Sequence, residues 1–258
     1  MVDGAHQFLA GLGSGLAGGL LSGAFGIGGG IVLVPLLALA LHLDQHRAQG
    51  VTLAAMLLPN SLPAVLHFRR QGVAIHWGLV AWMTGGFLPG LVAGSFAANA
   101  VPGRPLRLGF ACFLVLLAAG VWRSASRAPS APGDSQAGRF PPLPAAAIGL
   151  AGGACAGLLG IGGGVVVIPL LLWAFPLSQR EAQLQSLVLL LPPLGLPGVL
   201  VYAASSELPW LLLGGVALGF AAGAALGARA TSRMRGPWLS RGFALLLVAM
   251  AALLLQKT

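Results

Sequence analysis

Six polar but uncharged side chains stand out inside long apolar stretches of the sequence that contain no charged residue. They are Gln49, Thr52, Asn60, Gln183, Gln185 and Ser186. If these stretches lie in a lipid bilayer, polar groups there need partners and become candidate binding groups. Interhelical hydrogen bonds, worth about 0.6 kcal/mol on average, are the competing interpretation. We expect all of them except Gln185 to bind a substrate, with Thr52 and Ser186 as the first pair to test.

Two glycine clusters are the second candidate, since Gly-Ile-Gly-Gly-Gly occurs at 26–30 and again at 160–164. Consecutive glycines weaken a helix, and unwound backbone at membrane depth persists only where it is buried or lines a cavity. Each cluster leads into an apolar arm whose N-terminal N–H groups and dipole attract anions without a charged side chain. We expect backbone binding of an anion at Gly26, Gly28, Gly29, Gly30, Gly160, Gly162, Gly163 and Gly164.

A proline follows each cluster inside its apolar arm. Pro35 and Pro169 each leave a backbone carbonyl unpaired and bend the arm. A static kink is one interpretation, and a moving gate is the other; we expect both prolines to act in gating. Gly90-x-x-x-Gly94 and Gly223-x-x-x-Gly227 have a spacing that lets helices approach closely, so we interpret these four glycines as packing positions.

Several other chemistries lack the residues that they need. The dinucleotide-binding fingerprint fails because Ile31 stands where its last glycine should be. No Asp, Glu or His lies within an apolar stretch, which disfavours a buried proton relay and an intramembrane serine hydrolase. His42-x-Asp44-x-His46 falls in a short loop without a counterpart in the second half, so we predict no metal site.

The two cysteines, Cys112 and Cys155, match no metal or redox spacing. We interpret both as small buried residues, although a sulfur relay through either one stays open.

The stretches that hold these residues are long enough to cross a membrane. The chain has 258 residues, 57% hydrophobic and 7% charged, where a soluble domain carries roughly 25% charged residues. Eight stretches contain no Asp, Glu, Lys, Arg or His: 7–41, 48–66, 77–103, 108–122, 140–179, 182–206, 208–228 and 242–256. The formal charge of +9 comes mostly from arginines scattered between them, which is typical of membrane topology and not of nucleic-acid binding. We predict an all-α polytopic membrane protein with about eight hydrophobic spans.

An internal repeat divides the chain. GAFGIGGGIVLVPLL at 23–37 aligns without gaps with GLLGIGGGVVVIPLL at 157–171, and ten of the fifteen positions are identical. The same offset places Gln49 on Gln183 and Thr52 on Ser186. We predict a first transmembrane repeat at 1–123, a polar linker at 124–142 and a second transmembrane repeat at 143–258. Duplication of this kind is common in secondary transporters, whose substrate lies between the halves.

The relative orientation of the halves follows from the glycine clusters. An unbroken helix over 7–41 would be about 52 Å long, beyond a hydrocarbon core of about 30 Å. We expect instead two short helical arms joined by an unwound turn, followed by three full helices in each half. The loops at 67–76, 123–142, 176–181 and 229–241 then share one side and hold ten arginines, against four positive residues on the other side. The positive-inside rule makes the linker cytoplasmic and both termini external, so that the repeats are inverted.

The doubled glycine motif resembles the TauE/SafE family of sulfite exporters and related permeases. The resemblance includes the proline in each arm and Ala-Gln-x-x-[Thr/Ser]-Leu at 48–53 and 182–187, and it covers both halves. It implies export or movement of sulfite, sulfonates or other small anions across a bacterial cytoplasmic membrane, without a redox cofactor. One departure is that Leu184-Gln185 stands where the first half has Gly50-Val51, so the two half-sites differ chemically.

We therefore expect a secondary transporter that holds a small anion near the midplane between the glycine clusters and works by alternating access. It needs no cofactor and is no enzyme; its partners are the anion and the lipid bilayer, and its oligomeric state stays open. Two alternatives remain. One is a membrane assembly subunit that binds another protein through its small-residue faces, and the other is a cation permease that uses His42, His46, His67 and His76.

Overall fold

The computed structural model describes residues 4–25, 30–58, 61–125, 140–205, 208–231 and 237–256, and every regular element in these ranges is an α-helix. The first half contains α1 (Gly4–Phe25), α2 (Gly30–Ala40), α3 (Gln45–Ala55), α4 (Leu62–Arg70), α5 (Trp77–Ala100) and α6 (Gly103–Ala125). The second half contains α7 (Pro142–Leu159), α8 (Gly164–Ala174), α9 (Gln179–Leu189), α10 (Leu196–Ser205), α11 (Trp210–Thr231) and α12 (Pro237–Gln256). The two halves repeat the same order of one long, three short and two long helices, and the prediction of an all-α protein is confirmed.

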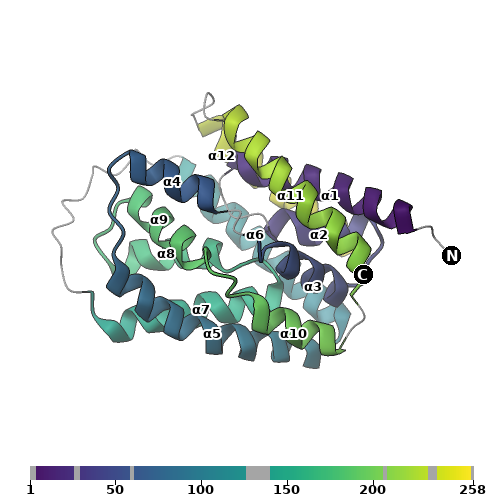
Figure 1. Ribbon diagram of the computed structural model, residues 1–258, viewed down its shortest axis with the longest axis horizontal. Helices are drawn as coiled ribbons and strands as arrows, with labels where there is room; N and C mark the ends of the chain where they lie inside the picture. The colour runs from purple at the N-terminus through teal and green to yellow at the C-terminus, as the bar shows by residue number, and fades with distance from the viewer. Residues whose placement is uncertain are drawn as a thin grey trace.

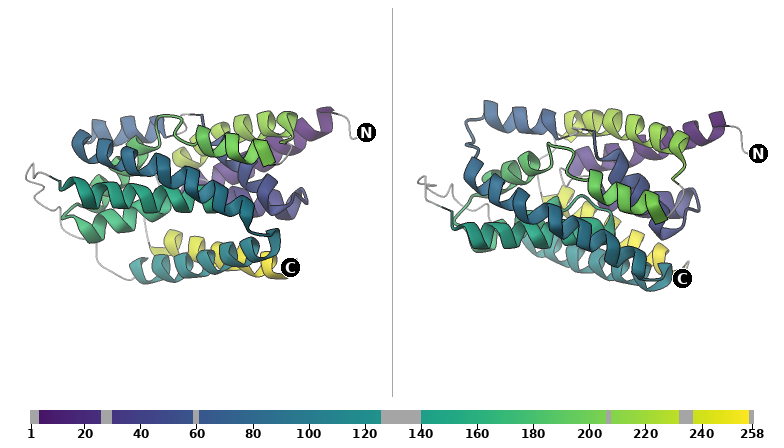
Figure 2. Two further views of the ribbon diagram at one scale, coloured as in Figure 1. Left: turned by 90° about the horizontal axis from the view of Figure 1, so that it is seen from below. Right: turned by 60° about the horizontal axis from the view of Figure 1, so that its bottom comes forward.

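The long helices pair between the halves. α1 packs along α11, α5 along α7 and α6 along α12 (Figure 1). The short helices α2, α3, α8 and α9 lie between these pairs, and most residues of α2 and α3 are buried. In Figure 2 the α6/α12 pair forms a separate layer along one side. Each half therefore contributes one helix to every long pair, so that neither half is a separate body.

Glycine stripes explain how the long helices approach so closely. At twelve positions a Cβ atom would strike a backbone carbonyl oxygen of the paired helix. They are Gly11, Gly15 and Gly19 on α1, Gly215, Gly219 and Gly223 on α11, Gly86, Gly90 and Gly94 on α5, and Gly149, Gly153 and Gly157 on α7. The interpretation of Gly90, Gly94 and Gly223 as packing positions is thereby confirmed.

The register of these contacts shows the helix directions. Gly11 meets Leu212 and Gly19 meets Phe220, so α1 and α11 run parallel. Gly86 meets Ala146 and Gly94 meets Ala154, so α5 and α7 run parallel too. The two pairs run in opposite directions, because α1 begins at the end of the molecule where α12 finishes, and α7 begins at the far end (Figures 1 and 2).

The predicted helix lengths need two corrections. The first arms of the hairpins are not short, because α1 has 22 residues and α7 has 18; only the second arms, α2 and α8, are short, with 11 residues each. The expected full helices over 48–66 and 182–206 are each divided, into α3 and α4 and into α9 and α10. Pro192 and Pro193 explain the second division, since proline cannot supply the N–H that continues a helix.

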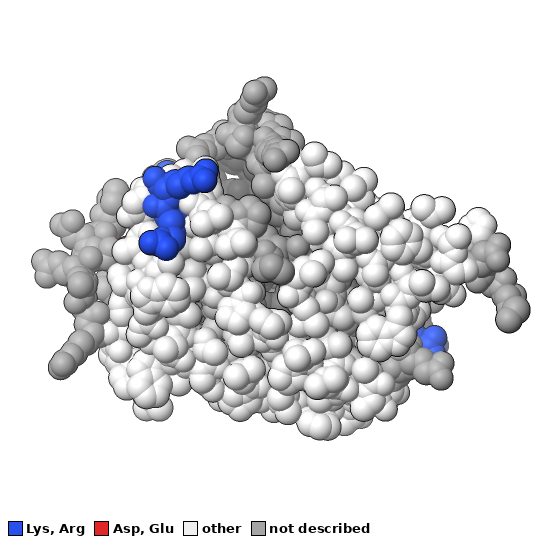
Figure 3. Space-filling model, viewed as in Figure 1, with Lys and Arg blue, Asp and Glu red and all other residues white. Residues whose placement is uncertain are grey.

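The count of eight spans stays a prediction. Within the described residues, four helices are both long and apolar enough to cross a membrane: Trp77–Ala100, Gly103–Arg123, Pro142–Leu159 and Trp210–Gly227. Four further helices are apolar but shorter: Gly30–Ala40, Gly164–Ala174, Leu196–Ser205 and Ala244–Gln256. Figure 3 shows one basic patch over α4, which carries Arg69 and Arg70, on a face that is otherwise nearly uncharged, as lipid contact requires.

Candidate functional site

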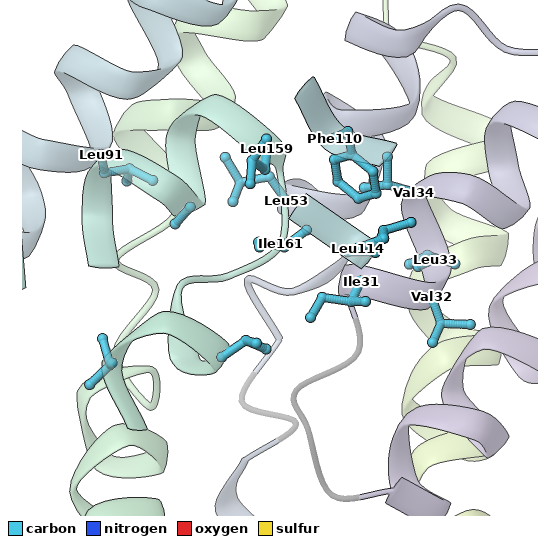
Figure 4. Close-up of a cluster of buried hydrophobic side chains, with 14 of the residues drawn as sticks. Ile31, Val32, Leu33, Val34, Leu53, Leu91, Phe110, Leu114, Leu159 and Ile161 are labelled. Carbon is cyan, nitrogen blue, oxygen red and sulfur yellow. The ribbon is translucent and has the colours of Figure 1, made fainter. Parts of the chain in front are cut away.

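Gly30, the last residue of the first glycine cluster, lies against the second cluster. Gly30 is the buried first residue of α2, and a Cβ atom there would lie 2.6 Å from the Cα atom of Ile161. Figure 4 shows Ile161 in the same buried cluster as Ile31 and Leu53 of the first half. Only glycine leaves room for this contact between backbones. The other predicted binding positions of the first cluster, Gly26, Gly28 and Gly29, lie outside the described residues.

The second cluster is unwound, as its composition predicts. α7 ends at Leu159 and is capped by Gly160 at φ 70°. Gly162 and Gly163 follow at φ 76° and 66°, in the left-handed region that favours glycine. α8 then begins at Gly164. Gly164 N–H donates to the Gly162 carbonyl at 2.7 Å, whereas the N–H groups of residues 161–163 donate to no backbone carbonyl of the described residues. The turn therefore offers consecutive amides beside the N-terminus of α8.

Helices α3 and α9 lie against this turn. A Cβ atom on Gly160 would lie 2.7 Å from the Cβ atom of Gln49, and one on Gly164 would lie 3.0 Å from Ser186 Oγ. The structure thus brings Gln49 and Ser186, two of the predicted site residues, to the second cluster. Gln183 lies on α9 and is half-buried, and Asn60 lies outside the described residues.

Gln49 is part of a buried hydrogen-bond cluster that includes the chain's one tyrosine. The Tyr202 hydroxyl of α10 donates to the Gly157 carbonyl at 2.7 Å and lies 3.0 Å from Gln49 Oε1. A hydroxyl has one hydrogen, so it cannot donate to both oxygens. If the Gln49 amide is turned over, its NH₂ donates to Tyr202 instead. Either orientation leaves one polar atom of the Gln49 amide buried without a partner among the described residues.

Two further hydroxyls are buried near this cluster without partners. Thr52 Oγ1, one turn after Gln49 on α3, and Ser95 Oγ of α5 make no hydrogen bond to any described residue. A Cβ atom on Gly157, whose carbonyl Tyr202 binds, would lie 2.9 Å from Ser95 Oγ. A buried polar group without a partner costs about 1–3 kcal/mol, so these groups favour a ligand that supplies the missing bonds.

Ser186 differs from Thr52 despite its matching place in the repeat. Its hydroxyl donates to the Gly164 carbonyl at 3.5 Å, which is the interhelical bond of the competing interpretation. Pro35 is buried inside α2, whereas Pro169 is exposed inside α8, so the two predicted gating prolines have unequal surroundings.

A cavity of about 30 Å³ adjoins the turn, enough for one or two water molecules. Uncharged residues of both halves line it: Leu53, Met56, Phe87, Leu91, Ala156, Gly162, Leu190, Pro192, Leu194 and Gly195. The space beside the turn is therefore small, and no charged side chain lines it.

The remaining candidate groups have other contacts. Asp44 caps α3 by accepting from Arg47 N–H at 3.0 Å, and His46 Nε2 lies 3.0 Å from the Ala98 carbonyl. Cys112 is exposed on α6, and Cys155 is half-buried on α7. No three His, Cys, Asp or Glu side chains of the described residues come together as metal ligands.

Sequence reasoning missed Tyr202 and Ser95 as members of this cluster. Tyr202 could have been noticed as the one tyrosine, standing inside an apolar stretch. Ser95 offered no such signal, because a serine within a glycine-rich helix is unremarkable in sequence.

The chain is similar to known proteins over nearly its whole length. A family model described as "Sulfite exporter TauE/SafE" matches residues 11–254. The chain is 27% identical over 223 residues to a Bacillus subtilis protein named "Probable membrane transporter protein YdhB", covering 84% of this chain and 87% of that protein. It is 26% identical over 254 residues to a "Probable membrane transporter protein" of Xylella fastidiosa, covering 96% and 94%. No solved structure matches.

Proposed function

The chain belongs to the sulfite exporter TauE/SafE family and is a membrane transporter, and on this premise we propose that it exports a small anion such as sulfite or a sulfonate by alternating access. The substrate is held beside the second glycine cluster, where the halves meet. The proposed site has no charged side chain, so its ligands are backbone amides, hydroxyls and a side-chain amide.

One observation carries this proposal: Thr52 Oγ1 is buried without a partner one turn from Gln49, which lies against the turn at Gly160. Consecutive backbone amides in such turns form concave anion sites. An oxyanion with three oxygen atoms matches a site that offers several N–H and O–H donors. A desolvated cation at the same place would be repelled by the positive end of the α8 dipole.

The proposed architecture is a pair of inverted repeats, 1–123 and 143–258, joined by a cytoplasmic linker at 124–142 in a bacterial inner membrane with about eight spans. The opposite directions of α1 and α7 support the inverted arrangement. The pairing of α1 with α11 and of α5 with α7 supports it as well, since each pair is the counterpart of the other. Rocking of one half against the other, with bending at Pro35 and Pro169, would expose the site to each side in turn.

Sulfite efflux from proteoliposomes tests the site. Thr52→Val keeps the shape of the side chain and removes its hydroxyl; we expect efflux to fall about tenfold or more, because the lost bond to an anion is charge-assisted. Thr84→Val is the matched control, since the Thr84 hydroxyl binds Val80 within its own helix. Equal efflux in wild type and Thr52→Val would refute the site, and wild-type protein that moves neither sulfite nor a sulfonate would refute the substrate class.

A further inference from the structure

A second polar cluster lies at the end of the molecule where α7 begins, away from the glycine turn. His76 precedes α5, and its backbone N–H donates to Gln185 Oε1 of α9 at 3.0 Å. Gln185 Nε2 donates in turn to the Ala74 carbonyl at 3.0 Å. Two hydrogen bonds therefore fasten a loop of the first half to a helix of the second half.

The His76 imidazole faces a carboxylate within this cluster. Its Nε2 atom lies 4.0 Å from Glu181 Oε1 of α9, and the two side chains are only 14% and 10% exposed. Nε2 makes no hydrogen bond to a described residue. The ring packs against Phe140 at 4.8 Å between centroids, and Phe140 packs edge-on against Phe175 at 5.3 Å. These rings limit the access of water to the pair.

Glu181 is held in place by its own helix. Its Oε2 atom accepts from Ser178 N–H at 2.8 Å, and Ser178 Oγ accepts from Glu181 N–H, which together make a capping box at the start of α9. The carboxylate is thus fixed while its other oxygen points to His76. Only five acidic residues occur in the chain, so a buried one that faces a histidine across the two halves is unusual.

The other charged groups on the elements around this pair are exposed. They are His67, Arg69 and Arg70 of α4 and Arg180 of α9, and the described parts of α5, α7 and α8 bear no charged side chain. His67 bonds to Gln71 at 2.9 Å. Arg127, Asp134 and Arg139 of the linker lie outside the described residues.

We propose that His76 and Glu181 form a proton-binding site that latches the two halves at this end of the transporter. Proton uptake from water at His76 Nε2 makes an imidazolium that attracts the Glu181 carboxylate, and proton loss to water releases it. Histidine is the side chain whose charge changes with pH in the physiological range, so the latch closes in acid and opens in base. The site deepens the proposed function, because release of the latch would be the opening step of alternating access.

Hydrogen exchange of the full-length protein in lipid nanodiscs tests the latch without any substrate. Amide protection of segments 71–80 and 176–186, corrected for the intrinsic effect of pH, should fall about fivefold between pH 5.5 and 8.0, the factor expected of a weak ion pair. Glu181→Gln keeps the capping box and removes the charge, since glutamine also serves at that position. His76→Gln keeps the backbone bond to Gln185. Both variants, and the double variant, should lose the pH effect equally.

His67→Gln is the matched control, because this exposed histidine lies on the neighbouring helix α4, and it should keep the full pH effect. A pH effect that survives His76→Gln or Glu181→Gln would overturn the latch. Sulfite efflux measured in parallel separates the two proposals. If wild type moves no anion but its protection still depends on His76 and Glu181, the proposed substrate fails and the proton site stands. If wild type moves sulfite but its amide protection does not depend on His76 and Glu181, only the proposed proton site is refuted.

Discussion

Thr52 and Ser186 occupy corresponding places in the repeat but have different surroundings. The Thr52 hydroxyl is buried without a partner among the described residues, whereas the Ser186 hydroxyl binds the Gly164 carbonyl. Gln49 and Tyr202 add to this asymmetry, because they link α3 to α10 beside the turn. The first half therefore supplies the donors that lack partners, and the second half supplies the unwound backbone.

Tyr202→Phe tests the cluster at the scale of one hydroxyl. The change leaves the Gly157 carbonyl and the Gln49 amide buried without this bond, so the free energy of unfolding should fall by about 1–3 kcal/mol. Ser205→Ala is the control on the same helix, since the Ser205 hydroxyl lies 3.1 Å from two carbonyls of its own helix, those of Val201 and Tyr202, and donates to one of them. Unfolding in mixed detergent micelles measures both. Equal stability of Tyr202→Phe and wild type would contradict the cluster.

At the scale of the helix, glycines have two different structural roles. Those in the stripes of α1, α5, α7 and α11 allow helices to pack backbone against backbone, and they remain helical. Gly160, Gly162 and Gly163 instead have positive φ and end a helix. The spacing of four residues distinguishes the stripes, and the consecutive placement distinguishes the turn.

Neighbouring glycines of α5 provide a matched test of the stripes. Gly86→Ala places a methyl group against the Ala146 carbonyl oxygen, so the helices must separate, at a cost of about 1–3 kcal/mol. Nothing lies within 4 Å of the corresponding position on Gly85, so Gly85→Ala should be neutral or stabilise the helix by up to about 1 kcal/mol. The pair Gly215→Ala and Gly214→Ala should behave alike on α11. Thermal unfolding of the four variants measures the difference, and similar melting of Gly85→Ala and Gly86→Ala would refute the stripe.

At the scale of the whole molecule, the two ends have distinct chemistry. Contacts of His76 with Phe140 and Glu181 gather the 67–76 and 176–181 loops and the start of α7 at one end. His46 joins α3 to the end of α5 at the other. Two of the loops that the charge bias assigns to one side of the membrane, 67–76 and 176–181, are thus neighbours in space.

Labelling with a membrane-impermeant thiol reagent tests which end faces outward. In a chain with Cys112→Ala and Cys155→Ala, we expect Arg104→Cys to react in intact cells. Gln71→Cys and Arg180→Cys should react only after permeabilisation, because the positive-inside rule predicts that the arginine-rich side is cytoplasmic. All three positions are exposed in the structure. The reverse pattern would invert the proposed topology, and reaction of all three in intact cells would exclude a single orientation.

The sequence alone determined the helical class, the membrane setting, the duplication and the break at the second glycine cluster. These properties can be read directly from the sequence. The length of the apolar stretches indicates the membrane and the helices, the similarity of 23–37 to 157–171 indicates the duplication, and consecutive glycines interrupt a helix locally. The same local rules misjudged the first hairpin arms and overlooked the divisions that create α4 and α10.

Only the tertiary structure decided which groups meet. Gln49 and Tyr202 are 153 positions apart, and His76 and Gln185 are 109 apart. The contact of Gly30 with Ile161 likewise joins two halves that no local pattern relates in space. Packing between helices determines whether a buried hydroxyl is satisfied, as at Ser186, or left without a partner among the described residues, as at Thr52, because desolvation depends on every neighbour and not on the residue itself.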